Sequence, residues 1–125
     1  MKPRWWVICL CAAWCGVCRE YRALFDALAE RHPDVLFRWV DVEDREDLVG
    51  DLEVETFPTL LVGEGGEPRF LGPLAPHAAV LERLLASLQE EGAPRVPASA
   101  ADRALLGRIQ AADAAGQLAR MGAAS

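Results

Sequence analysis

The sequence has no cysteine outside residues 9–18, although it contains four of them. Small proteins held together by disulfides distribute their bridges along the whole chain, so this clustering argues against a disulfide scaffold. With 125 residues, of which 52% are hydrophobic, the chain is long enough to bury a core without such bridges. We therefore expect one ordinary globular body whose cysteines serve chemistry rather than stability.

Long apolar runs and an excess of positive charge are also missing. No run of eighteen apolar residues occurs, so no membrane-spanning helix is expected. The net charge of −6 argues against a nucleic-acid partner, which would need a basic face. The first fifteen residues have a basic start and a short apolar run, as secretory signals do. A cytoplasmic location is the main expectation, and a periplasmic or secreted one is the alternative.

Hydrophobic periodicity predicts the order strand, helix, strand, short helix, strand, strand, helix, and then one appended helix. The expected strands are 4–11, 35–42, 58–62 and 69–71, and the expected helices are 16–31, a turn around Leu48, 76–90 and about 100–115. Both faces of the first strand are apolar, so it should be central. The first strand–helix–strand unit should be a right-handed parallel crossover, and the last two strands should be antiparallel. This predicts an α/β fold with a mixed four-stranded sheet sandwiched by helices.

Composition changes after the last predicted strand and helix. Residues 92–99 are rich in proline, glycine and alanine and are predicted to form a linker. Ser99, with Asp102 three residues later, is typical of a helix N-cap. We therefore divide the chain into a domain at 1–91 and, at 92–125, a linker and appended helix that packs on or beside it, with a frayed end. In the helix at 16–31, the expected buried stripe is Val17, Tyr21, Leu24 and Leu28, widened by Phe25.

Cys15 and Cys18 are three residues apart at the junction of a predicted strand and helix. This spacing lets the two sulfurs meet across the first helical turn. Cys15 would lie at the helix N-terminus, where free amide groups and the helix dipole favour an anion. A thiolate is the nucleophile of disulfide exchange. Cys18, one turn further in, should be more buried and is placed to resolve a mixed disulfide.

The other two cysteines, Cys9 and Cys11, lie on one face of the first predicted strand. Such positions are about 6.5 to 7 Å apart, which is a poor separation for a disulfide. An extended strand is also a poor source of two zinc ligands, and neither His32 nor His77 has ligand spacing, so no metal is expected. The default prediction is that Cys9 and Cys11 act as small buried hydrophobes. The alternative is that Cys9 is a third thiol, which exchanges with the Cys15–Cys18 pair.

The motif Trp-Cys-Gly-Val-Cys at 14–18, followed by a helix and by Thr-Phe-Pro-Thr at 56–59 before a strand, resembles the thioredoxin family over about residues 4–90. The resemblance implies a cis Phe57–Pro58 bond, an isomer that is rare and usually serves a purpose. It also implies a substrate groove, whose residues here are Trp14, Gly16, Val17, Phe57, Pro58 and Thr59.

By the same resemblance, the protein should be a thiol–disulfide oxidoreductase that binds no cofactor. Val17 stands where the family has a proline and carries no charge to stabilise a Cys15 thiolate, which favours a disulfide reductase over a strong oxidant. Cys15 would attack a protein or small-molecule disulfide and Cys18 would resolve the mixed disulfide. Electrons would come from a reductase or another thiol donor.

Several positions depart from the family pattern. The strand and helix that open full thioredoxins are absent before the motif strand, and the appended helix is expected to cover part of the surface left bare. Cys9 stands where the family has a buried carboxylate, and Trp39 stands at the matching position of a lysine. The usual proton relay is therefore missing, with Asp41 or Glu43 as a possible substitute acceptor. The missing relay and the extra helix motivate an alternative function, a thioredoxin-fold binding or redox-switch module with little turnover, whereas the intact Cys15 and Cys18 count against it.

Overall fold

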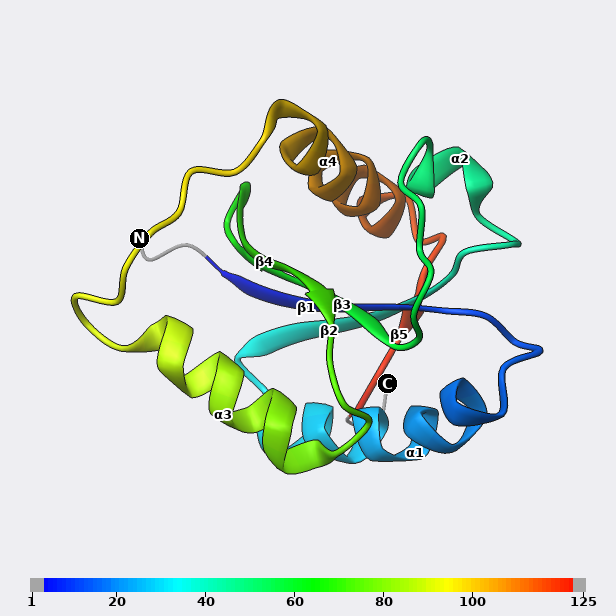
Figure 1. Cartoon of the computed structure of the whole chain (residues 1–125), viewed down its shortest axis with the longest axis horizontal. Coiled ribbons are helices and arrows are strands. Elements are labelled where there is room, and N and C mark those ends of the chain that lie inside the picture. Colours follow the sequence, from blue (N-terminus) through cyan, green and yellow to red (C-terminus); the bar gives the residue numbers. More distant parts are fainter. Residues whose placement is uncertain (1–3, 123–125) are drawn as a thin grey trace.

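A mixed β-sheet forms the middle layer of the molecule and has helices on both faces (Figure 1). The computed structural model describes residues 4–122. The strands are β1 (Trp5–Cys11), β2 (Val35–Asp41), β3 (Thr59–Glu64), β4 (Glu67–Pro73) and β5 (Ala119–Arg120), and the helices are α1 (Gly16–Arg31), α2 (Glu46–Val49), α3 (Ala78–Gln89) and α4 (Ala100–Ala114). In Figure 1, α1 and α3 cover one face of the sheet, and α4 and α2 cover the other. The predicted order of strands and helices is confirmed from β1 to α4, and β5 is an addition.

The strand order is β4-β3-β1-β2-β5, which places β1 in the centre as the sequence predicts. β1 is parallel to β2 and antiparallel to β3, and β3 is antiparallel to β4. Val7 and Cys9 face the core shared with α1 and α3, whereas Ile8 and Leu10 face the core shared with α4. The alternation of a strand buried on both faces therefore decides which β1 residues meet α1.

Helix α1 is rotated relative to the predicted stripe. Tyr21 and Leu28 are buried as expected, but Val17 and Leu24 are each 41% exposed. The true buried face is Cys18, Tyr21, Phe25, Leu28 and Ala29. The packing of Phe25 decides the rotation, because its ring makes edge contacts with Phe37 at 5.2 Å and Trp39 at 5.7 Å between ring centres.

The sequence predicts a frayed end after α4, and this prediction is wrong. Ala119 and Arg120 form β5, which pairs antiparallel with Trp39 and Arg38 at the outer edge of β2. The amide of Gly122 donates a hydrogen bond of 2.6 Å to Asp26 of α1. A strand of two residues is too short to show hydrophobic alternation, so the sequence contains no pattern that predicts β5. The strand forms because its backbone pairs with β2.

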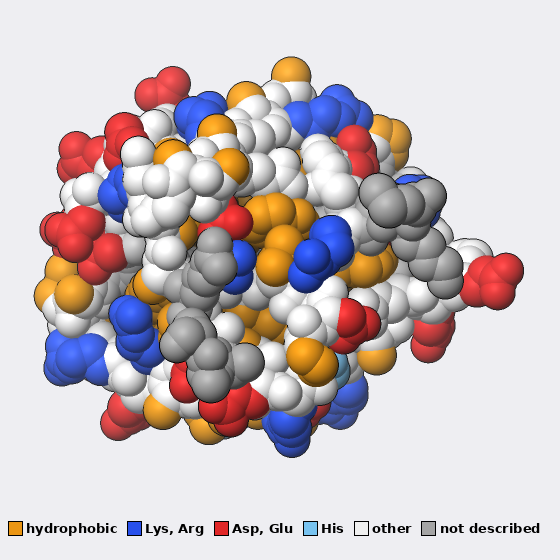
Figure 2. All heavy atoms as spheres, turned by 180° about the vertical axis from the view of Figure 1, so that it is seen from behind, with side chains coloured by type: hydrophobic (Ala, Val, Ile, Leu, Met, Phe, Trp, Pro, Cys, Tyr) orange, Lys and Arg blue, Asp and Glu red, His pale blue; other side chains and the backbone are white. Residues whose placement is uncertain are grey.

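The face opposite to that of Figure 1 is shown in Figure 2. Hydrophobic side chains gather near its centre, and acidic and basic side chains are interspersed around its rim. No continuous basic surface is visible on this face. Between residues 4 and 122, none of the helices combines the length and the apolar character that crossing a bilayer requires.

Helix α4 covers the second face of the sheet. Its buried residues Leu105, Leu106, Ile109 and Ala112 pack in one cluster with residues of β1 and β3. Gly63 of β3 allows this close approach, since a Cβ atom there would lie 2.8 Å from Leu106 Cδ2. The predicted N-cap is present, because the amide of Asp102 donates to the Ser99 hydroxyl at 3.1 Å.

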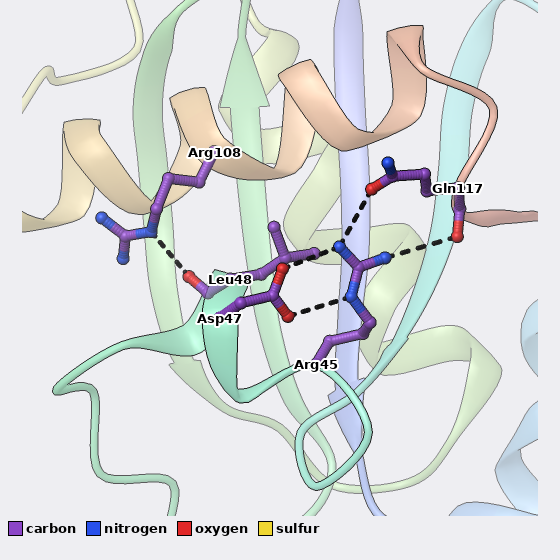
Figure 3. A network of polar contacts seen from close by, with 5 residues as sticks. All are labelled: Arg45, Asp47, Leu48, Arg108 and Gln117. Atoms are coloured by element: carbon purple, nitrogen blue, oxygen red, sulfur yellow. Dashed lines mark hydrogen bonds and ion pairs between the residues drawn. The ribbon is translucent and has the colours of Figure 1, made fainter.

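Polar contacts fix α4 and the chain after it against α2 (Figure 3). Arg45 donates to the Asp47 carboxylate at 2.9 and 3.1 Å and to Gln117 Oε1 at 3.1 Å. Arg108 of α4 donates to the Leu48 carbonyl at 2.8 Å. The region after the linker is therefore joined to the sheet body by packing and by hydrogen bonds.

Substitutions at two neighbouring residues of α4 should change the free energy of unfolding in opposite directions, and together they test this packing. Leu106→Ala should lower the free energy of unfolding by about 2 to 5 kcal/mol, because Leu106 is fully buried. Gly107→Ala should raise it by about 0.5 to 1 kcal/mol, because Gly107 lies in a helix with open space around it. Urea unfolding followed by circular dichroism, in one redox buffer, measures both. Equal effects of the two substitutions would contradict the docking of α4.

Candidate redox site

All four cysteines lie where the C-terminal end of β1 meets the N-terminus of α1. Cys9 and Cys11 belong to β1, Cys15 is the N-cap residue of α1, and Cys18 is its third residue. Cys9 and Cys11 are 0% exposed and Cys18 is 1% exposed, whereas Cys15 is half-buried. Burial therefore separates one accessible thiol from three enclosed sulfurs.

A disulfide joins Cys11 to Cys18, and Cys9 and Cys15 are free. The Cα atoms of the bonded pair are 5.8 Å apart, within the range that disulfides require. The sequence led us to pair Cys15 with Cys18 and to treat Cys11 as an apolar residue, so this bond differs from both expectations. The bond results from tertiary packing, because Cys11 of β1 and Cys18 of α1 face the same core between the sheet and the helix.

The loop between β1 and α1 is held by backbone and side-chain hydrogen bonds. The amide of Cys15 donates to the Ala12 carbonyl at 3.0 Å. Arg19 donates to the Ala13 carbonyl, and the Ala13 amide donates to Asp41 Oδ2, both at 3.0 Å. These contacts fix the position from which Cys15 faces solvent.

Asp41, considered as a substitute proton acceptor, lies at the end of β2 beside this loop. Besides the Ala13 amide, its carboxylate accepts hydrogen bonds from the amides of Glu43 at 2.9 Å and Asp44 at 3.2 Å. Three backbone donors therefore occupy it, which gives Asp41 a clear role in holding the loop. Sequence reasoning did not anticipate that role.

Cys9 lies against the disulfide, with its Sγ donating to Cys11 Sγ at 3.7 Å. Burial raises the pKa of the Cys9 thiol, and the positive charge of Arg22 opposes this shift in part. The neighbouring Tyr21 hydroxyl is buried and has no hydrogen-bond partner within the described part of the chain. Burial, and secondarily the charge of a Cys9 thiolate, raises the pKa of Tyr21. Both groups are therefore neutral at neutral pH.

The segment before β3 lies next to the cysteine loop. The Phe57–Pro58 peptide bond is cis, as the resemblance implies. Trp14 is 65% exposed, and its ring makes an edge contact with Phe57 at 5.7 Å between ring centres. The Thr59 hydroxyl donates to the Thr56 carbonyl at 2.6 Å and so closes the turn. Two parts of the predicted groove, far apart in sequence, are thus in contact.

The remaining predicted groove residues flank Cys15 in the first turn of α1. Gly16 and Val17 are exposed and follow Cys15 directly. A Cβ atom at Gly16 would meet no atom closer than 3.7 Å, so glycine is not required there by space. Trp14 and Val17, which precede and follow Cys15 in the sequence, therefore present apolar side chains to solvent.

No metal centre is evident in this cluster. Among residues 4–122, no group of three or more His, Cys, Asp or Glu side chains is arranged so as to hold a metal ion.

Comparison with known proteins gives a consistent picture. The family described as Thioredoxin matches residues 2–83. Thioredoxin domain-containing protein 2 of Mus musculus is 52% identical over 48 residues, which cover 38% of this chain and 9% of that protein. Human thioredoxin is 34% identical over 61 residues, covering 49% of this chain and 58% of that protein. The chain thus spans less than two thirds of these relatives.

Solved structures show the same similarity. The thioredoxin of Fasciola hepatica superposes with a TM-score of 0.62 at 28% identity, covering 68% of this chain and 81% of that one. Mitochondrial thioredoxin 3 of Saccharomyces cerevisiae, in its oxidised form, gives 0.59 at 27% identity, covering 67% and 78%. The fold prediction, a mixed sheet between helices of this type, is confirmed; β5 adds a fifth strand.

Alkylation of the native protein tests the separation of the two free thiols. Iodoacetamide should modify Cys15 and leave Cys9 unmodified at pH 7, because Cys9 is fully enclosed. Raising the pH to 9 should still leave Cys9 unmodified, because the raised pKa of its thiol keeps it protonated and a protonated thiol is a poor nucleophile. Peptide mass mapping before and after adding denaturant gives the readout. Equal labelling of both residues without denaturant would contradict the described burial.

Proposed function

This chain belongs to the thioredoxin family, and on that premise we propose that it is a thiol–disulfide oxidoreductase acting through Cys15 and Cys18. One observation carries the proposal: Cys15 is a free, half-exposed thiol at the N-cap of α1, with the buried Cys18 one turn behind it. The positive end of the helix dipole favours negative charge at the N-cap. A thiolate there is the attacking group that exchange requires.

The reaction starts from a form in which Cys15 and Cys18 are both reduced. The Cys15 thiolate attacks one sulfur of the substrate disulfide, forms a mixed disulfide and releases the other sulfur as a thiolate. The Cys18 sulfur, after losing its proton, then attacks Cys15 and releases the second substrate thiolate. The two electrons given to the substrate leave a Cys15–Cys18 disulfide, which a reductase or another thiol donor must reduce.

Exposed apolar side chains support a polypeptide as the disulfide substrate. Trp14 and Val17 flank Cys15, and Phe57 contacts Trp14 from the segment that ends in Pro58. Thr59 begins β3 and fixes the turn before it. Pro58 and Thr59 are buried, so a substrate chain would lie across Trp14, Val17 and Phe57 and bury apolar area near the attacking sulfur, which contributes binding free energy.

The uncharged residue between the two cysteines supports a direction for the reaction and a compartment that suits it. Val17, between the two cysteines, carries no charge that would stabilise a Cys15 thiolate further, and this favours a reductant over a strong oxidant. A reducing compartment such as the cytoplasm suits that role, because thiols are kept reduced there. No cofactor is needed for the exchange.

A specific observation favours a second candidate, a redox-switch module with little turnover. Cys18 is bonded to Cys11, so in this form Cys15 has no resolving partner. The positions of the family's carboxylate and lysine are held by Cys9 and Trp39, both packed in the apolar core. Turnover with a small disulfide separates the candidates, since a module would react once and stop.

Removing the nucleophile is the first test. Cys15→Ser should lower the rate of reduction of a disulfide-bonded protein, with dithiothreitol as electron donor, by on the order of a thousandfold or more. Cys18→Ser should instead accumulate a mixed disulfide between Cys15 and the substrate, visible by mass, because resolution is lost. If Cys15→Ser reduced the substrate as fast as the unmodified protein, the assignment of Cys15 would be wrong.

A second test addresses the apolar contact. Trp14→Ala should raise KM for a protein disulfide roughly tenfold, equivalent to about 1.4 kcal/mol, and leave kcat for a small disulfide nearly unchanged. Val96→Ala is the matched control, because Val96 is 81% exposed and lies in the linker. Steady-state kinetics with both substrates give the readout. Equal KM changes in the two variants would argue against binding at Trp14.

A further inference from the structure

We propose that Cys11 is a third redox-active cysteine, which competes with Cys15 for the sulfur of Cys18. The protein would then have two oxidised forms, one bonded between Cys15 and Cys18 and one between Cys11 and Cys18. The inference rests on the proposed function of the Cys15–Cys18 pair and adds a second partner for its resolving sulfur.

Cys18 has two candidate partners, Cys15 by its spacing in the sequence and Cys11 by the bond in the structure. Cys15 precedes it by three residues in the first turn of α1, the spacing that lets two sulfurs meet. Cys11 lies across from it at the end of β1, with a Cα–Cα distance of 5.8 Å and a disulfide to it. One sulfur can hold only one of these bonds at a time, so the two disulfides exclude each other.

The two forms interconvert without any outside oxidant or reductant. The Cys15 thiolate attacks Cys18 Sγ, the Cys15–Cys18 bond forms, the Cys11–Cys18 bond breaks, and Cys11 leaves as a thiolate. The reverse step starts from the Cys11 thiolate and releases Cys15. One thiolate is consumed and one is produced, so charge, protons and electrons balance in each direction.

Cys9 stabilises the departing sulfur. Its Sγ lies 3.7 Å from Cys11 Sγ, and burial holds the Cys9 thiol protonated by raising its pKa. The Cys9 S–H therefore donates a hydrogen bond to the Cys11 sulfur both in the disulfide and in the thiolate. Cys9 is a positioning residue for this exchange, at the place where a carboxylate would otherwise stand.

Burial gives the two oxidised forms different access to outside thiols. Cys11 and Cys18 are 0% and 1% exposed, so an external thiol has no path to either sulfur in the folded state. Cys15 is half-buried and reaches solvent. The Cys11–Cys18 form is thus a shielded disulfide that opens from within, through Cys15, and it leaves Cys15 free while Cys18 is occupied.

Disulfide mapping of Cys15→Ala tests the existence of the second form. The variant is refolded and brought to equilibrium in a glutathione redox buffer that oxidises the unmodified protein, so access does not limit the result. After acid quench and alkylation, chymotrypsin cleaves after Trp14 and separates Cys11 from Cys18 in sequence. We expect two peptides linked by Cys11–Cys18. If Cys9, Cys11 and Cys18 are all found free or bound to glutathione, the proposal is wrong. If Cys15→Ala does not fold, the same test is made with Cys15→Ser.

Reduction kinetics test the shielding. The disulfide of Cys15→Ala should be reduced by added glutathione at least about tenfold more slowly than that of the unmodified protein, because only Cys15 can open it from within. Cys9→Ala should slow opening in the unmodified background without removing the Cys11–Cys18 bond. Equal reduction rates of Cys15→Ala and the unmodified protein would contradict opening through Cys15.

Cys11→Ala separates this inference from the proposed function. This variant cannot form the Cys11–Cys18 disulfide, so its oxidised form should contain only the Cys15–Cys18 bond. If the two oxidised forms are equally populated in the unmodified protein, the variant should turn over about twofold faster than the unmodified protein. If Cys11→Ala turns over but Cys15→Ala never forms a bridge, this inference alone fails. If Cys15→Ala forms the bridge but neither Cys11→Ala nor the unmodified protein turns over, the oxidoreductase function fails.

Discussion

The burial of β1 on both faces is the constraint on which the rest of the structure depends. A strand alternates its side chains, so odd-numbered residues of β1 face α1 and α3 while even-numbered residues face α4. This alternation brings Cys9 and Cys11 to the face where α1 begins. It also requires a second helical layer over Ile8 and Leu10. The redox cluster and the appended helix therefore have the same origin.

Helix α4 satisfies the second half of that constraint. It packs Leu105, Leu106 and Ile109 against the sheet, and a glycine in β3 lets it come close. Arg38 of β2 and Asp113 of α4 add a buried ion pair, in which Arg38 also donates to the Phe37 carbonyl at 2.9 Å. Removing one partner from such a pair leaves an uncompensated buried charge, so the pair ties the end of α4 to β2.

At the redox site, differences in burial give identical side chains different chemistry. Cys15 keeps access to solvent at a helix N-cap, and Cys18 is enclosed one turn away. Cys9 is held as a neutral thiol by burial. Cys11 and Cys18 share a bond, and both residues are fully buried. In the proposed exchange, Cys15 is the attacking thiol, Cys18 is the sulfur shared by the two disulfides, Cys11 is its alternative partner and Cys9 is a hydrogen-bond donor.

The sequence alone determined the order of the elements from β1 to α4, the central position of β1, the N-cap of α4 and the cysteine and proline motifs. Each of these depends on the spacing and hydrophobic pattern of residues close together in the chain. The sequence correctly predicted a buried Cys18 but wrongly placed Val17 and Leu24 on the buried face of α1, because the rotation of the helix depends on how Phe25 packs against β2. It gave no sign of β5, which exists only through pairing with β2. Only the tertiary structure decided that Cys11 bonds Cys18, because the distance between the end of a strand and the first turn of a helix is set by packing and not by residue spacing.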